Sequence, residues 1–189
     1  MSRAKELEIS AFASAHAWRQ WLARNHTASD GIWLRLFKKT SGVASVTYDE
    51  ALDEALCYGW IDGQLKSYDA KSWLRKFTPR RAKSVWSKKN LDHVARLTRA
   101  GRMKAAGRKA AEAARQDVAY DSPSKAAVPK DFLKALAKNA KAKACFATLN
   151  KANVYAITWR LQTAKKPETR QKRLEAILAM LARGERFHP

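Results

Sequence analysis

The chain has 189 residues, 46% of them hydrophobic, and a formal net charge of +21. Its seven Trp and six Phe exclude a disordered chain, because they supply enough apolar surface for a folded core. The positive charge is uneven: residues 1–63 hold seven Lys/Arg and eight Asp/Glu, whereas residues 64–189 hold 31 and nine. A positive electrostatic field from such a surplus attracts polyanions. The alternative is that the charge reflects solubility or a compositional bias.

The N-terminus and the cysteines indicate a cytoplasmic protein. Residues 1–6 lack the apolar region of a signal peptide. The longest apolar run, 176–182, is far shorter than the ~20 residues that span a bilayer. Cys57 and Cys145 lie in apolar helical patterns without a CxxC motif, so we expect two buried thiols rather than a disulfide framework.

The first third of the chain predicts alternating strands and helices. A short strand is expected at 6–9, and a helix over 14–25 begins with a capping serine. Residues 32–37 are rich in β-formers. The stretch 47–59 begins with a Thr-x-x-Glu capping box, carries one apolar and one acidic face, and ends at glycine.

Two further segments follow with β character. Residues 60–65 read as a strand or tight turn, and residues 72–77 as a strand ended by Pro79. If the second strand joins that of 32–37 in one sheet, alternation would put four aromatic residues and two arginines on one face, namely Trp33, Arg35, Phe37, Trp73, Arg75 and Phe77. Helical patterns then run from 84 to 117, broken at Gly101.

The remaining sequence predicts a separate helical module. Residues 118–129 contain two prolines and a Ser/Asp cluster, which are typical of a linker. Beyond it, 130–189 shows only helical periodicity. The predicted fold is therefore an α+β N-terminal domain over 1–117, with a small antiparallel sheet and packed helices, followed by a small all-helical C-terminal module.

Catalytic motifs are absent from the sequence. The four histidines are scattered, and no GxSxG, P-loop, HExxH or GxGxxG occurs. Ser84 and Ser87 are expected to cap a helix, and Cys57 at a helix C-terminus is expected to stay a thiol. The sequence thus indicates a non-enzymatic protein with no catalytic residue, metal or cofactor.

Two dense blocks carry the most information. The first, 55–63, contains Tyr58, Trp60 and Asp62, and the second, 77–90, ends at Asn90; these four residues form the core of the motif. Because both blocks are aromatic and a hairpin-sized stretch joins them, we expect them to bury each other. Asp62 either shapes an Asp-Gly turn or orients Arg80 or Arg81 as an ion pair.

These blocks, together with the Gly31-Ile32-Trp33-Leu34 and Glu168-Thr169-Arg170 stretches, resemble the YdeI/OmpD-associated family of bacteriocin-protection proteins. The resemblance extends over nearly the whole chain, and 130–189 resembles the family's OmpD-associated domain. It implies a bacterial protein linked to envelope stress, to an outer-membrane porin and to tolerance of antimicrobial peptides. It implies no catalytic residues.

The binding site is predicted within the basic segment 71–109, which holds fourteen Lys/Arg and one acid. Part of this charge is expected to neutralise the acidic helix face at 49–54. The remainder would bind an anionic partner: nucleic acid, an acidic protein or lipid headgroups. The candidate residues for this partner are Arg80, Arg81, Lys83, Trp86, Lys88 and Lys89.

Two alternatives stay open beside this hypothesis of a basic anion-binding stress factor. One is a small-molecule-binding or catalytic domain whose aromatic pocket is lined by Tyr58, Trp60 and Trp86. The other is non-specific nucleic-acid binding, because no signature of sequence-specific recognition occurs. The sequence defines no oligomeric state.

Overall fold

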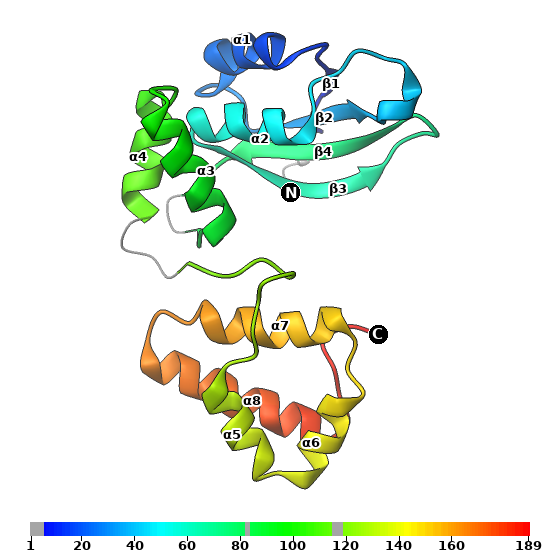
Figure 1. Cartoon of the computed structure of the whole chain (residues 1–189), viewed down its shortest axis with the longest axis vertical. Coiled ribbons are helices and arrows are strands. Elements are labelled where there is room, and N and C mark those ends of the chain that lie inside the picture. The colour runs from blue at the N-terminus through cyan, green and yellow to red at the C-terminus, as the bar shows by residue number, and fades with distance from the viewer. Residues whose placement is uncertain (1–5, 82–83, 115–118) are drawn as a thin grey trace. The chain divides into compact units, whose positions relative to one another are not determined.

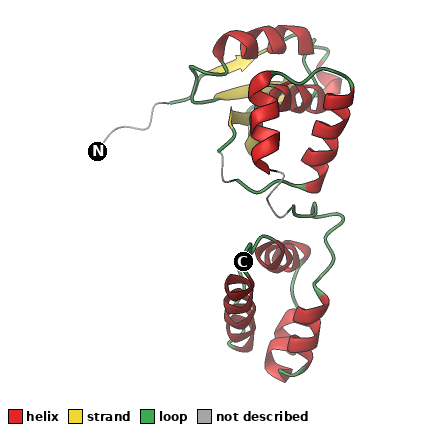
Figure 2. Cartoon of the chain, turned by 90° about the vertical axis from the view of Figure 1, so that its left-hand side faces the viewer, coloured by secondary structure: helices red, strands yellow, loops and turns green. Residues whose placement is uncertain are grey.

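The computed structural model describes residues 6–81, 84–114 and 119–189. It divides into two compact units: unit 1 lies within Met1–Ser84 and Leu91–Arg115, and unit 2 within Val85–Asn90 and Gln116–Pro189. Unit 1 contains the sheet and unit 2 is helical (Figures 1 and 2), so the α+β fold class with a helical C-terminal module is confirmed. Over 130–189 the structure has no strand.

The elements of unit 1 follow the predicted order, with the first strand shifted from 6–9 to Ile9–Ala11. They are β1 (Ile9–Ala11), α1 (Ala15–Asn25), β2 (Ile32–Phe37), a 3-10 turn η1 (Lys39–Ser41), α2 (Tyr48–Cys57), β3 (Trp60–Ser67), β4 (Ser72–Pro79), α3 (Lys88–Arg99), whose first turn lies in unit 2, and α4 (Ala105–Ala114).

The sheet has the order β1-β2-β4-β3. Its β2/β4 and β3/β4 pairs are antiparallel, as predicted, whereas β1 runs parallel to β2. The parallel pair arises because α1 returns the chain across the sheet between the two strands, which is the connection that parallel strands need.

The predicted face of four aromatics and two arginines is wrong. In the β2/β4 pair, Phe77 lies opposite Ile32, and Trp73 lies opposite Leu36. Because opposed residues share a face, Phe77 joins the buried Ile32 rather than Trp33. The alternation within each strand is as predicted. The pairing register between β2 and β4 differs by one residue from the one assumed, which moves the residues of β4 to the opposite face relative to those of β2.

Helices α1 and α2 pack on the face of the sheet that carries Phe77 (Figure 1). Trp18 of α1 is fully buried, its ring lies 5.7 Å from that of Phe77, and its indole N–H donates to the carbonyl of Ala51 at 3.0 Å. Buried indoles need such a partner. This contact fixes α1 against α2.

Unit 2 contains α5 (Lys130–Ala137), α6 (Ala140–Ala147), α7 (Lys151–Gln162) and α8 (Pro167–Ala182). Their core is apolar and is formed by Phe132, Leu136, Ala142, Ile157, Leu161, Leu174, Ile177 and Leu181. None of the helices in the described ranges is long and apolar enough to cross a membrane.

Residues of the predicted linker 118–129 are tied to α7. The Asp121 backbone N–H donates to Gln162, whose side chain donates back to the Asp121 carboxylate at 2.9 Å, and the Tyr155 hydroxyl donates to the Asp121 carbonyl. The Tyr120 N–H donates to the Trp86 carbonyl at 3.0 Å. The boundaries 1–117 and 130–189 of independently folding domains stay predictions.

Candidate functional site

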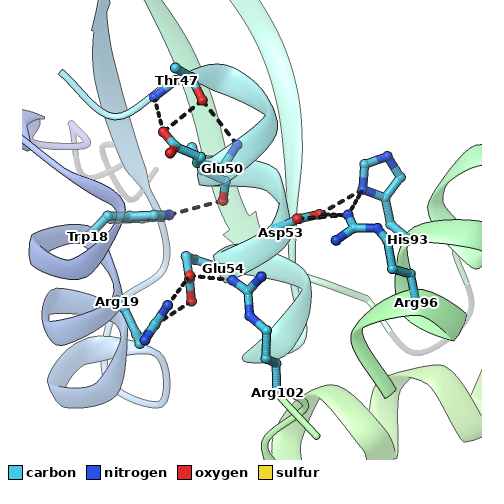
Figure 3. A network of polar contacts seen from close by, with 10 residues as sticks. Trp18, Arg19, Thr47, Glu50, Asp53, Glu54, His93, Arg96 and Arg102 are labelled. Atoms are coloured by element: carbon cyan, nitrogen blue, oxygen red, sulfur yellow. Dashed lines mark hydrogen bonds and ion pairs between the residues drawn. The ribbon is translucent and has the colours of Figure 1, made fainter. Parts of the chain in front are cut away.

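Two acids of α2, Glu54 and Asp53, are paired with basic residues inside unit 1. Glu54 is only 2% exposed, and its carboxylate accepts from Arg19 of α1 at 2.6 and 2.8 Å and from Arg102 at 2.6 Å (Figure 3). Two guanidinium groups from separate parts of the chain thus converge on one buried charge. This confirms the expected pairing of the acidic helix with the basic segment and adds Arg19 to it.

Asp53 lies one residue earlier and faces α3. Its carboxylate accepts from Arg96 at 2.7 Å and lies 2.7 Å from Nδ1 of His93 (Figure 3). Burial on its own would raise the pKa of Asp53, but the hydrogen bonds from Arg96 and His93 outweigh it and lower the pKa below its ordinary value.

A pH dependence of stability follows from this lowered pKa. A carboxyl group whose pKa falls on folding stabilises the protein at pH values above its pKa in the unfolded state. This stabilisation is lost as the pH falls through its pKa in the folded state. We therefore expect the melting temperature of unit 1 to decline as the pH drops below about 4, and the decline to be shallower in Asp53→Asn. Calorimetry at several pH values checks this. Parallel curves for both proteins would contradict it.

The connection from α2 to β3 depends on close contact with α4. Gly59 has φ +74°, and a Cβ there would lie 2.9 Å from the Ala106 carbonyl oxygen. A Cβ on Gly107 would lie 2.2 Å from the Cys57 carbonyl oxygen, which also accepts the Lys104 N–H at 3.0 Å. Only glycine at 59 and 107 lets the two backbones approach this closely.

Cys57 lies at this contact, and burial followed by the Glu54 charge raises the pKa of its thiol to about 11. The thiolate is the reactive form, so we expect Cys57 to resist iodoacetamide at pH 8 in the folded protein. Cys145 is partly exposed, so the prediction that it is buried is wrong, and its thiol should react first. Mass spectrometry of the two peptides with and without urea distinguishes them, and equal labelling of both in the folded protein would contradict the buried site.

Where the two sequence blocks meet, unit 1 has a pocket of about 310 Å³. The blocks touch as predicted, since Trp60 pairs with Pro79 and Ile61 with Thr78. The pocket is lined by the end of α1, the α2–β3 connection, the end of β4 and one face of α4, namely His26, Thr27, Tyr58, Gly59, Trp60, Pro79, Arg80, Arg81, Ala106, Lys109, Ala110 and Ala113.

The aromatic residues of the pocket are held in place. Trp60 is 1% exposed and its indole N–H donates to the His26 carbonyl at 3.0 Å, while the Tyr58 ring lies 5.1 Å from that of His26. Burial, followed by the charge of Glu54, raises the pKa of Tyr58, so its hydroxyl stays protonated at neutral pH. These two aromatic side chains are therefore fixed and neutral, and they present little of their surface to the pocket.

The charge of the pocket is positive. Arg80, Arg81 and Lys109, here called the basic rim, are its ionised side chains, and no carboxylate of the described residues lines it. The backbone N–H of Arg80 donates to the Gly59 carbonyl at 2.9 Å, which fixes the backbone of the basic rim to the α2–β3 connection. The arrangement can hold an anion beside an apolar wall.

Asp62 has a different position from either prediction. It lies within β3, beside a register irregularity between Asp62 and Leu65, rather than in a tight turn. Its carboxylate accepts from Arg75 and from the Tyr48 hydroxyl at 2.8 Å, not from Arg80 or Arg81. Burial and this carboxylate raise the pKa of Tyr48 to about 12. Asp62 joins α2 to the sheet.

The other candidate residues that the structure describes do not line this pocket. Trp86, Lys88, Lys89 and Asn90 lie in unit 2, where Lys88 lies 3.0 Å from Asp121, and Trp86 does not line the pocket. Lys83 lies outside the described residues. The sequence analysis did not include Lys109. Gly107, two residues earlier, is the signal that could have indicated it, because this glycine lets α4 approach the end of α2 beside the pocket. The sequence analysis also did not include His26 and Thr27, for which no signal exists.

Comparison with known families gives two matches. Residues 10–110, more than half of the chain, match the family model described as Domain of unknown function (DUF8412). Residues 125–184 match the model described as Bacteriocin-protection, YdeI or OmpD-Associated, which confirms the predicted family in the C-terminal part. No curated protein and no solved structure matches the chain significantly. The chain therefore belongs to the family of Domain of unknown function (DUF8412) and carries a YdeI or OmpD-associated domain at its C-terminal end.

Proposed function

We propose that the protein is a non-enzymatic binding protein whose anionic partner docks on the basic rim of the pocket. The observation that carries this proposal is that Arg80, Arg81 and Lys109 line one cavity with no carboxylate of the described residues among its lining. Cations that converge on a concave, partly apolar site attract anions more strongly than cations dispersed in solvent, because low-dielectric walls focus the field.

Internal ion pairing supports the same proposal. The two buried acids of α2, Asp53 and Glu54, are occupied by Arg19, Arg96 and Arg102. None of these three arginines lines the pocket. Two of the four acids of α2 are therefore paired with arginines that do not line the pocket.

The family match supports a physiological setting. A C-terminal domain described as bacteriocin-protection, YdeI or OmpD-associated fits a cytoplasmic stress factor of a bacterium that contributes to tolerance of antimicrobial peptides. A strain lacking the gene should then survive bacteriocin exposure less well than its parent, and survival should return with the wild-type gene but not with a variant that lacks the basic rim.

Binding is tested with three polyanions: a single-stranded oligonucleotide, polyglutamate and vesicles containing an anionic lipid. The rim variant Arg80→Gln/Arg81→Gln/Lys109→Gln is compared with Arg24→Gln/Lys39→Gln/Arg99→Gln, which removes the same charge from exposed positions of unit 1. For the oligonucleotide, each lost phosphate contact changes the log–log salt slope by about 0.7. The rim variant should therefore bind with a slope about two units shallower, and the control with a slope close to that of the wild type.

The outcomes separate the partner classes. Binding to one probe that depends on the rim supports the proposal and names the class. Equal loss in both variants would mean that only net charge matters, and no binding to any probe at ~50 mM salt would reject the proposal. A third variant, Lys88→Gln/Lys89→Gln, tests the candidates in unit 2 separately.

A further inference from the structure

Helix α5 of unit 2 has two faces of different character. Phe132 and Leu136 are buried in the core of the unit. The residues at i, i+3, i+4, i+7 and i+8 from the start of the helix lie together on its other side, and the C-cap residue among them keeps a helical conformation. All five are exposed, and they are here called the lysine face: Lys130, Leu133, Lys134, Ala137 and Lys138.

The charge of the lysine face is not compensated by neighbouring acids. Residues 130–151 contain six lysines and a single acid, Asp131. The carboxylate of Asp131 accepts from Arg170 of α8 at 3.0 Å. None of the three lysines of the face forms an ion pair with any residue that the structure describes. Their ammonium groups are therefore available to a partner.

A helix face that meets only water usually mixes charges of both signs. On α8 of the same unit, the exposed positions include Glu168, Lys172 and Glu175. The lysine face instead repeats one charge at spacings of four residues, where like charges repel each other and destabilise a helix. It also leaves Leu133 43% exposed between the cations. An anionic partner with an apolar interior would offset both costs.

The composition of the lysine face favours a lipid surface over nucleic acid. Nucleic-acid sites combine arginine, whose planar guanidinium binds phosphate, with exposed aromatic rings on which bases stack. Residues 130–151 contain no arginine, and their aromatic residues, Phe132 and Phe146, pack in the core of unit 2. Lysine on its flexible stem follows mobile headgroups, and an exposed leucine enters the boundary between headgroups and acyl chains.

From these observations we infer that the lysine face of α5 docks on the surface of an anionic lipid bilayer. The helix lies along the surface, so that three ammonium groups spread over about 12 Å of helix meet the headgroup phosphates, and Leu133 enters the interface between them. This inference goes beyond the proposed function. It uses residues of unit 2 and does not need the basic rim.

Cosedimentation of the full chain with vesicles tests the inference. The vesicles contain phosphatidylcholine and phosphatidylglycerol in equal parts, and vesicles of phosphatidylcholine alone serve as the neutral comparison. At ~100 mM salt the protein should bind the anionic vesicles at least tenfold more tightly than the neutral ones, because each lysine at an anionic surface contributes about fivefold to binding.

Two triple variants of equal charge locate the contact. The first removes the lysines of the face, as Lys130→Gln/Lys134→Gln/Lys138→Gln, and should bind anionic vesicles about a hundredfold more weakly. The control removes three exposed lysines of the same unit from α6, α7 and α8, as Lys143→Gln/Lys151→Gln/Lys172→Gln. It should bind within about threefold of the wild type, since these lysines lie outside the contact. All six positions are exposed, so both variants keep the fold, which circular dichroism checks.

A further variant, Leu133→Ala, tests the apolar contact without a change of charge. It should bind anionic vesicles about fivefold more weakly, because less apolar surface enters the bilayer, and should bind a single-stranded oligonucleotide as the wild type does. Unchanged vesicle binding in this variant would contradict the insertion of Leu133 and with it the docking geometry.

Equal losses of vesicle binding in the two triple variants would overturn the inference, as would equal binding of the wild type to neutral and anionic vesicles. A lysine-face variant that loses oligonucleotide binding but keeps vesicle binding would identify nucleic acid as the partner instead. The rim variant separates this inference from the proposed function. Vesicle binding that is lost in the rim variant alone rejects the inference and leaves the proposed function standing, whereas loss in the lysine-face variant alone supports the inference whatever the rim binds.

Discussion

Replacement of Gly107 by alanine should destabilise unit 1 by about 3 kcal/mol, the upper part of the range for overpacked sites. The new Cβ would lie 2.2 Å from the carbonyl oxygen of Cys57 and 2.7 Å from that of Leu56. Both are backbone atoms of α2, which cannot rotate away as a side chain can. Separation of α4 from α2 would also open one wall of the pocket.

The sign of this effect is informative, because alanine normally stabilises a helix by about 1 kcal/mol relative to glycine. Urea unfolding measures the change, and Gly101→Ala is the matched control. Gly101 has φ +66°, and a Cβ there would meet no atom of the described residues within 4 Å, so this variant should lose only about 1 kcal/mol from backbone strain. A Gly107→Ala protein as stable as the wild type would place α4 away from α2.

Loss of the Glu54 charge should have the second largest effect. Glu54→Gln leaves Arg19 and Arg102 facing a neutral amide at a site where the carboxylate is 2% exposed. Removal of one partner from a buried pair costs about 3–5 kcal/mol. Since the two arginines are 44% and 37% exposed and regain water, we expect about 2 kcal/mol.

Asp49→Asn is the control for this variant, because Asp49 is an exposed acid on the same helix. It should change the free energy of unfolding by less than about 1 kcal/mol, through the helix dipole alone. Chemical denaturation of both variants at pH 7 gives the comparison. Equal losses would show that Glu54 acts through net charge on the helix and not through its two arginines.

Local signals predicted the elements of unit 1 well. The capping serine at 14 and the capping box at Thr47 fixed the starts of α1 and α2, and both bonds are present. Glycine at 59 fixed the end of α2, since a left-handed residue stops a helix. These signals involve neighbours in sequence, so both partners of each contact are visible together in the sequence.

Contacts between distant residues were harder to predict. Alternation in β2 and β4 is visible in the sequence, but the register that puts Phe77 opposite Ile32 is set by packing under α1 and α2. The sequence presents the second block as one unit, yet within unit 2 its Trp86 carbonyl accepts from the Tyr120 backbone N–H. Lys109 and Arg80 line the same pocket because α4 packs against α2. Gly107 is the sequence feature that indicates this contact between the two helices.

Protection of Lys109 from acetylation is the most direct measure of whether a partner occupies the basic rim. Sulfo-NHS-acetate modifies exposed amines, and Lys109 and Lys39 are both exposed in unit 1. Mass spectrometry would compare their modification rates with and without the polyanion that binds most tightly. Lys109 should be protected several-fold and Lys39 left unchanged. Unchanged modification of Lys109 in the presence of a saturating polyanion would contradict binding at the basic rim.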